Sequence, residues 1–235
     1  MVLPTSGVKA QWIEFRRELN YLSMPSEGFA EEFDLASVDH VLSTARSVRR
    51  KLDFSRAIEP EVLFECIDIA TQAPMGIGGE SWRFMVVTEA EPKLQLAELY
   101  REIIIGFQQE RGLEIKPAQH ALMDRLHEMP AMVFVCIVGD APSEGIGEQI
   151  GFYGSILPAA WSLMVAMRAR GLGSTWTSLL AARQEEVGGI LKIPTGVVQT
   201  VMLPVGYMKG AKLAKAKRKS AAELTFWNQW GNPQE

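Results

Sequence analysis

Two arginines and a serine lie within four residues, at Arg46, Ser47 and Arg49. A guanidinium group is permanently charged and donates hydrogen bonds in a fork, so it suits a phosphate or another delocalised anion. A neighbouring hydroxyl adds one more donor. We interpret this spacing as an anion-binding site. The simpler alternative is the solvated basic end of a helix.

A second basic segment, residues 209–219, contains six lysines and arginines and is the densest positive patch in the chain. Such a patch is compatible with nucleic-acid binding. However, no aromatic residue is interleaved with these cations, and the whole chain has a formal net charge of −4. We therefore expect no nucleic-acid partner. This basic tail either contributes a cation to a ligand site or stays solvated.

The histidines and cysteines do not predict further chemistry. His120 and His127 lie seven residues apart without a carboxylate or cysteine pattern, and His40 stands alone, so we expect no metal site. Cys66 and Cys136 each lie inside an apolar stretch. A reduced, buried thiol is the ordinary interpretation of such cysteines, and it favours a cytoplasmic location.

The composition is that of a soluble globular protein, with 235 residues, 47% of them hydrophobic and 22% charged. Residues 1–37 are predicted to be an N-terminal extension, because a helical stripe of apolar residues is followed there by an acidic linker. Residues 38–235 show no second boundary and are predicted to be one domain.

Alternating helical and strand patterns predict the architecture of this domain. A helix is expected to follow Pro60 over residues 61–72, and strands are expected at residues 83–89 and 201–207. Residues 131–139 are almost entirely apolar, which predicts a strand at the centre of its sheet. The order of elements predicts an α+β domain with a mixed central sheet flanked by helices.

Two stretches are harder to interpret. Residues 150–167 carry no charge, but they contain Pro158 and several glycines and serines, so we expect a core helix and no membrane span. Residues 101–129 are irregular, and we expect a surface excursion there. Loops of this kind often hold specificity, and this one is expected to form a mobile cover over the site.

Four separated segments, taken in order, resemble the nitroreductase superfamily. The first reads R-S-V-R, the second runs from A-P to W-R-F, the third begins G-L-G, and the fourth ends L-P-V-G-Y. They correspond here to residues 46–53, 73–84, 171–177 and 193–207, and the resemblance spans roughly residues 38–230.

The resemblance implies an FMN-binding protein. It assigns Arg46, Ser47 and Arg49 to the phosphate and to the ring edge that becomes negative on reduction. It also assigns Arg218 to the phosphate, with Lys217 and Lys219 as alternatives. The remaining FMN-binding residues that the resemblance implies are Pro74, Met75, Gly76, Trp176, Thr177 and Ser178. Among them, Thr177 is the catalytic candidate, because its segment is expected to pass the flavin N5 edge.

The resemblance also implies an activity. The chain would be a homodimeric oxidoreductase that takes hydride from NADH or NADPH and then reduces a nitroaromatic, a quinone or an activated alkene in a ping-pong reaction. The sequence has no G-x-G-x-x-G after a strand, so the nicotinamide would visit only transiently. Two alternatives are a flavin-binding protein without turnover and a dehalogenase. Dehalogenating relatives use Glu, Tyr and Lys from a lid, which here could correspond to Glu102, Tyr100 and Lys116.

Overall fold

The computed structural model describes residues 33–76 and 79–233. The chain divides after Val38, and the sheet and the helices that cover it belong to the unit that begins at Asp39. The predicted helical stripe of the N-terminal extension lies outside the described residues. In chain order, the described elements are α2 (Leu35–Thr44), β1 (Leu52–Asp53), α3 (Pro60–Ala70), β2 (Trp82–Val87), α4 (Ala90–Glu110), α5 (Pro117–Arg125), η1 (Leu126–Glu128), β3 (Ala131–Val138), α6 (Ile146–Gly154), α7 (Leu157–Ala169), β4 (Leu172–Ser174), η2 (Leu179–Arg183), α8 (Gln184–Leu191), β5 (Val197–Met208) and α9 (Ala221–Leu224).

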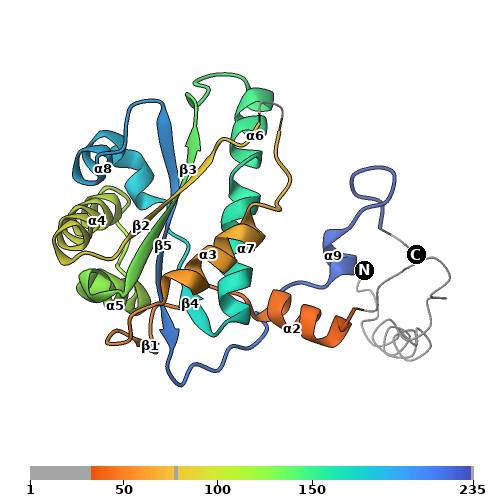
Figure 1. The fold of residues 1–235 in the computed structure, drawn as a ribbon. Coiled ribbons are helices and arrows are strands. Elements are labelled where there is room, and N and C mark those ends of the chain that lie inside the picture. The colour runs from red at the N-terminus through yellow and green to blue at the C-terminus, as the bar shows by residue number, and fades with distance from the viewer. Residues whose placement is uncertain (1–32, 77–78, 234–235) are drawn as a thin grey trace. The chain divides into compact units, whose positions relative to one another are not determined.

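Within the described residues, five strands form one sheet in the order β1–β5–β3–β2, with β4 also paired to β5. Helices α3, α6 and α7 lie on one side of the sheet, and α4, α5 and α8 lie on the other (Figure 1). The predicted α+β class is confirmed. The pairings of these strands are all antiparallel, whereas the sequence analysis expected a mixed sheet.

Strand β3 lies between β2 and β5, as its apolar sequence predicts. Its side chains alternate between the two faces of the sheet. Val133 and Val135 belong to the apolar cluster under α3 and α7, whereas Met132 and Phe134 belong to the cluster under α4, α5 and α8. Because helices cover both faces, almost every position of β3 has to be apolar.

The expected irregular excursion over residues 101–129 is wrong. Helix α4 runs on to Glu110, and α5 and η1 follow after a connection of six residues. Leu96, Tyr100, Ile104 and Gln108 are all buried and recur every four residues, which places them on one helix face. Gly106 and the run of polar residues after it hid this stripe in the sequence. The segment expected to form the mobile cover, residues 106–120, consists of the last turn of α4, the connection at residues 111–116 and the first turn of α5, and its role as a cover stays a prediction.

The uncharged stretch at residues 150–167 is two helices instead of one. The helix is interrupted at residues 155–156, two residues before Pro158. Proline restricts the backbone before it and cannot donate a helical hydrogen bond. Helix α7 has six buried residues, so the core prediction holds for this half, but α6 has none. Within the described residues, Ile146–Ala169 is the one stretch that is long and apolar enough to cross a membrane by length and composition.

Candidate functional site

The segment after α2 carries the predicted anion-binding residues, and it is extended, not helical. It lies beside β4 and the residues that follow β4. The Val48 amide donates to the Ser174 carbonyl (2.8 Å), and the Trp176 amide donates to Ser47 Oγ (3.1 Å). The Thr175 hydroxyl donates to the Val48 carbonyl (2.9 Å). Two predicted segments, joined here between residues up to 129 positions apart in the chain, are thus brought together by hydrogen bonds.

Gly173 makes this close approach possible. A Cβ atom built at this position would lie 2.8 Å from Leu52 Cδ2, closer than real Cβ atoms approach, and 3.1 Å from Val48 Cβ, which is tighter than most such contacts. The second glycine of G-L-G therefore has a packing role in this chain. It lets the extended segment lie directly against β4.

The extended segment and the basic tail together line an open cavity of about 480 Å³, formed by residues 46–51 and 211–213. Five of the lining residues are cations, and none of these nine residues is acidic: the cations are Arg46, Arg49, Arg50, Lys51 and Lys212. We call this space the basic cavity. Its charge suits a ligand group with two negative charges, such as a phosphate.

Three contacts hold the walls of the basic cavity. The Lys209 amide donates to the Lys51 carbonyl (2.8 Å), and Arg46 donates to the Ala214 carbonyl (3.3 Å). Lys209 also pairs with Asp53 at 3.3 Å. The hydroxyl and the amide of Ser55 donate to the Asp53 carboxylate, and with Lys209 they lower the pKa of Asp53 to about 2.

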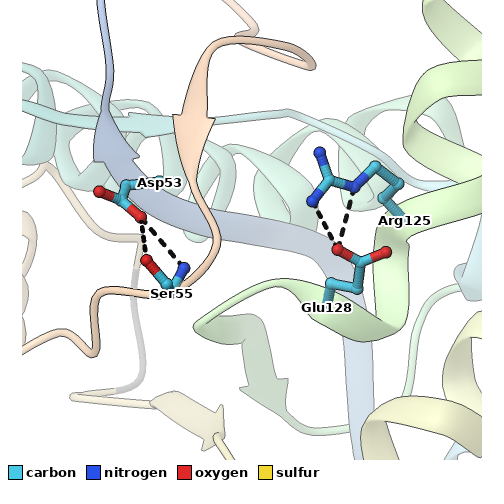
Figure 2. A network of polar contacts seen from close by, with 4 residues as sticks. All are labelled: Asp53, Ser55, Arg125 and Glu128. Atoms are coloured by element: carbon cyan, nitrogen blue, oxygen red, sulfur yellow. Dashed lines mark hydrogen bonds and ion pairs between the residues drawn. The ribbon is translucent and has the colours of Figure 1, made fainter.

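The loop after β1 is held from the other side of the sheet as well. Figure 2 shows the Asp53–Ser55 pair and, close to it, the ion pair of Arg125 with Glu128. The Arg125 guanidinium lies 3.6 Å from the ring centroid of Phe54, a cation–π contact. The chain next to the cavity wall is therefore held at Asp53, by Ser55 and Lys209, and at Phe54, by Arg125.

Thr177 is the buried end of the third predicted segment, residues 171–177, with 7% of its surface exposed. Its backbone forms a two-way bridge with Met202, at 3.2 and 2.9 Å. Its side chain hydrogen-bonds with the hydroxyl of Tyr100 on α4. Burial raises the pKa of Tyr100, while the bond to Thr177 and the charge of Arg49 act against that shift. Sequence reasoning missed this role of Tyr100, whose only signal was its place in the buried stripe of α4.

The predicted turn at Pro74, Met75 and Gly76 is held elsewhere, at the break between α6 and α7. The Gly76 amide donates to Ser155 Oγ (2.9 Å), and the indole N–H of Trp82 donates to the Ser155 carbonyl (2.6 Å). A Cβ at Gly76 would lie 2.7 Å from Ser155 Oγ. Met75 and Trp176 both pack, partly buried, against the cluster under α3 and α7, but no hydrogen bond among the described residues joins this turn to the basic cavity.

The remaining predicted residues are more exposed. Ser178 precedes η2, and Arg218 is exposed with its guanidinium donating to the carbonyl of its neighbour Lys217 (3.4 Å). The tail cation that lines the basic cavity is Lys212, which sequence reasoning did not single out. Nothing in the local sequence distinguishes Lys212 from the other cations of this tail, because lysine and alanine are also common in solvated segments.

Both cysteines are buried free thiols, as expected, and burial raises the pKa of Cys136 to about 12. Neither thiol is therefore activated as a nucleophile. Among residues 33–76 and 79–233, no group of three or more His, Cys, Asp or Glu side chains is placed to hold a metal ion.

Comparison with known proteins adds the decisive observation. The model of the nitroreductase family matches residues 42–207, which include the extended segment, the turn at Gly76, Thr177 and the end of β5. The chain belongs to the nitroreductase family. This result confirms the resemblance seen in the four sequence segments.

Two relatives illustrate the range of the family. The chain is 25% identical over 169 residues to a Methanothermobacter thermautotrophicus protein provisionally named as an NADH dehydrogenase/NAD(P)H nitroreductase, covering 71% of this chain and 74% of that protein. It is 28% identical over 191 residues to an iodotyrosine deiodinase of Drosophila melanogaster, covering 76% of this chain and 65% of that protein.

Solved structures share the fold. An iodotyrosine deiodinase bound to FMN and 3-iodo-L-tyrosine has a TM-score of 0.64 at 23% identity, covering 81% of this chain and 98% of the other. An NADPH:FMN oxidoreductase from Vibrio harveyi in complex with NAD⁺ has a TM-score of 0.62 at 15% identity, covering 83% and 78%. These likenesses confirm the fold.

Proposed function

We propose that this chain is an FMN-dependent oxidoreductase that uses NADH or NADPH to reduce a small electron-poor acceptor. The observation that carries the proposal is the basic cavity. It is lined by five cations and lies directly beside the Trp176–Thr177 segment. A flavin mononucleotide needs both parts, a place for a phosphate dianion and a buried, hydrogen-bonding surface for the edge of its ring.

The residues present fit this cofactor. Arg46 and Ser47 would hold the phosphate, since Ser47 Oγ accepts one hydrogen bond and its own O–H is still available to donate. Arg49 faces the same cavity and interacts with Tyr100 beside Thr177. It would therefore serve the ring edge instead of the phosphate. The turn at residues 74–76 would contact the ring through its backbone.

When bound, FMN would supply the redox chemistry, taking hydride from NADH or NADPH and passing it to a nitroaromatic, a quinone or an activated alkene. Arg49 keeps its positive charge and would stabilise the negative charge of a reduced ring. The Thr177 hydroxyl is buried and lies beside the Tyr100 hydroxyl, so its hydrogen bonds have a defined direction. Thr177 would orient the reacting edge of the ring, and no acid or base is required among these side chains.

An absorbance spectrum of the purified protein, followed by anaerobic addition of NADPH and then NADH, tests the proposal. We expect flavin bands for about one FMN per subunit and their bleaching by one of the nucleotides. Colourless protein that also fails to bind added FMN would overturn the proposal. Bound flavin that neither nucleotide bleaches would instead support a flavin-binding protein without turnover.

Reductive dehalogenation is the second candidate, favoured by the similarity to an iodotyrosine deiodinase. Tyr100 does not support it, because it is buried against Thr177, whereas Glu102 and Lys116 are exposed. These three side chains therefore do not form one lid. Iodide release from 3-iodo-L-tyrosine, measured beside the reduction of a nitroaromatic and a quinone, decides between the two reactions.

We further propose that the protein is a homodimer. Ile146 and Ile150 occupy one face of α6 and are 74% and 64% exposed, and Trp161 of α7 is 41% exposed. Exposed apolar side chains that gather on one face of a helix often mark a protein–protein interface. Sedimentation should give a dimer for the unmodified protein and for Glu148→Gln, but monomers for Ile146→Glu/Ile150→Glu. A monomeric unmodified protein would contradict the proposal.

A further inference from the structure

Residues 224–230 carry a dense group of exposed apolar side chains. Every residue from 217 to 233 is exposed, so none of them is buried against the folded body. We call residues 224–230 the aromatic turn. A single apolar residue on a surface needs no explanation, but a contiguous group of them marks a site of interaction. Within seven residues, the large apolar side chains are Leu224 (62% exposed), Phe226 (39%), Trp227 (48%) and Trp230 (92%).

Hydrogen bonds hold the aromatic turn in one shape. The Trp227 amide donates to the Asn232 carbonyl (2.7 Å), and the side-chain amide of Asn232 donates back to the Trp227 carbonyl (3.1 Å). The ring centroids of Phe226 and Trp230 lie 4.9 Å apart. The aromatic side chains are therefore presented together in advance, so little conformational entropy is lost when a partner covers them.

The aromatic turn follows the part of the basic tail that lies outside the basic cavity. Residues 209–230 contain six cations and a single carboxylate, that of Glu223. We call four of these cations the outer cations. They are exposed, do not line the basic cavity and form no ion pair within the described residues: Lys215, Lys217, Arg218 and Lys219.

This combination of charge and apolar surface is complementary to an anionic lipid bilayer. Tryptophan is favoured at the boundary between lipid and water, because its indole ring is apolar and carries one polar N–H. Clusters of four or more lysines and arginines are attracted by anionic headgroups. The formal net charge of −4 for the whole chain does not oppose this attraction, because charges more than about 8 Å apart are largely screened at physiological salt.

A single-stranded nucleic acid fits this surface less well. Such a ligand needs aromatic rings along its phosphate contacts, with free faces on which bases stack. In this chain the cations come first and the rings follow them, and Phe226 and Trp230 already pack against each other. The order of the residues therefore favours the bilayer.

We propose that the aromatic turn and the outer cations dock the protein on the surface of a bilayer that contains anionic lipids. The side chains of Trp227 and Trp230 enter the boundary below the headgroups, while the outer cations stay at the level of the headgroups. This mode of binding requires no membrane-spanning helix. The inference does not depend on the proposed FMN site.

The test is co-sedimentation of the whole chain with vesicles of phosphatidylcholine, either alone or with about one third phosphatidylserine. We expect binding to the mixed vesicles, and binding weaker by about tenfold or more when phosphatidylserine is left out. Added salt should weaken the binding to mixed vesicles.

Trp227→Ala/Trp230→Ala should weaken binding to the mixed vesicles about tenfold or more, because two large apolar side chains no longer leave water. Phe64→Ala is the matched control. Phe64 is 66% exposed on α3, away from the tail in sequence, and its removal should leave vesicle binding unchanged. Urea denaturation checks that the tryptophan variant is folded, and its midpoint should not change because both side chains are exposed.

Four results would overturn the inference. The first is no binding to either vesicle or equal binding to both, and the second is a tryptophan variant that binds as tightly as the unmodified protein. The third is a tryptophan variant that becomes monomeric in sedimentation without vesicles, because the aromatic turn would then cover a second copy of the chain. The fourth is retention of a single-stranded oligonucleotide by the unmodified protein, lost in the tryptophan variant, without vesicle binding.

Discussion

The two ends of the candidate site are built in opposite ways. At the basic cavity, the cations are mostly exposed, and Arg46 and Lys212 both face solvent. At the other end, which we call the ring end because the proposed function assigns the flavin ring to it, Thr177 and Tyr100 are 7% and 3% exposed, and hydrogen bonds to Met202 fix the backbone of Thr177. The first end is rich in charge and sparse in packing, whereas the second end is packed before any ligand arrives.

This difference indicates how each end would contribute to binding. Exposed charges interact through a high dielectric and are screened by salt, so the contribution of the basic cavity depends on the ligand's own charge. Buried hydrogen bonds are worth more, and they are costly to leave unpaired. We therefore expect substitutions at the basic cavity to change affinity and its salt dependence. Substitutions at the ring end should mainly change stability.

The largest expected effect is at the charged end. Arg46→Ala and Arg49→Ala should each weaken FMN binding by about 1.5–3 kcal/mol, the range of a lost charged hydrogen bond. The loss should shrink as salt is raised. Calorimetric titration measures both quantities. Arg101→Ala is the matched control, because Arg101 pairs with Asp124 on the surface of α4 and does not line the basic cavity.

Unchanged FMN affinity in both of these variants would mean that the extended segment is only a basic surface. The basic cavity would then not contribute charge to ligand binding, and the contrast between the two ends would be wrong.

The sequence predicted the strands β2, β3 and β5 and the central position of β3, because the apolar patterns that indicate them are local. Burial on both faces gives β3 its unbroken apolar run, and R-S-V-R and G-L-G are short patterns. The break at residues 155–156 and the full length of α4 were missed. The length of α4 depends on packing partners from distant parts of the chain, here the cluster around Phe134. Pro158 is a local signal for the break, but it was used only as an argument against a membrane span.

Lys212 and Tyr100 show the same limit within the site. Neither residue stands out by type or by spacing. Lys212 lines the basic cavity because Lys209 and Ala214 are anchored to the extended segment, and Tyr100 meets Thr177 because α4 packs next to η2. Contacts of this kind follow from the assembled fold, and a single sequence does not display them.

The next effect sharpens the account of the turn at residues 74–76. Gly76→Ala should lower the free energy of unfolding by about 1–2 kcal/mol, because its methyl group would meet Ser155 Oγ at 2.7 Å and disturb the bond from the Gly76 amide. Adding Ser155→Ala should recover part of that loss by removing the oxygen. Urea denaturation of the two variants provides the measurement.

Gly106→Ala is the control for this pair, because a Cβ there meets nothing within 4 Å in the middle of α4. It should be neutral or stabilising, since alanine favours a helix. A double variant no more stable than Gly76→Ala alone would show that the serine hydroxyl is not what requires glycine at this position.

A smaller effect tests the packed end directly. Tyr100→Phe and Thr177→Val should each cost about 1 kcal/mol of unfolding free energy, for one buried hydrogen bond. If the two hydroxyls are partners, the double variant should cost clearly less than the sum. Thr200→Val is the matched control: its hydroxyl donates to the Val135 carbonyl, so its cost should simply add to that of Tyr100→Phe. Additivity in the Tyr100–Thr177 cycle would remove Tyr100 from the site.

The smallest expected effect lies at the cavity wall, in the pH dependence of stability. The Ser55 hydroxyl and amide, with Lys209, lower the pKa of Asp53 from its ordinary value of 3.8 to about 2. A carboxyl group whose pKa is lower in the folded protein stabilises the fold above its unfolded pKa and loses that contribution as pH falls through its folded pKa. The advantage of the unmodified protein over Asp53→Asn should therefore be constant above about pH 5 and be mostly lost by about pH 2. Because Asp53 is at the surface, the difference should be small and should decrease with salt.

Asp140→Asn serves as the exposed control, and urea denaturation at a series of pH values measures the effect. An advantage that persists unchanged at pH 2 would show that the Ser55 hydrogen bonds act without the charge, and the cavity wall would then resemble the packed end more than the charged one.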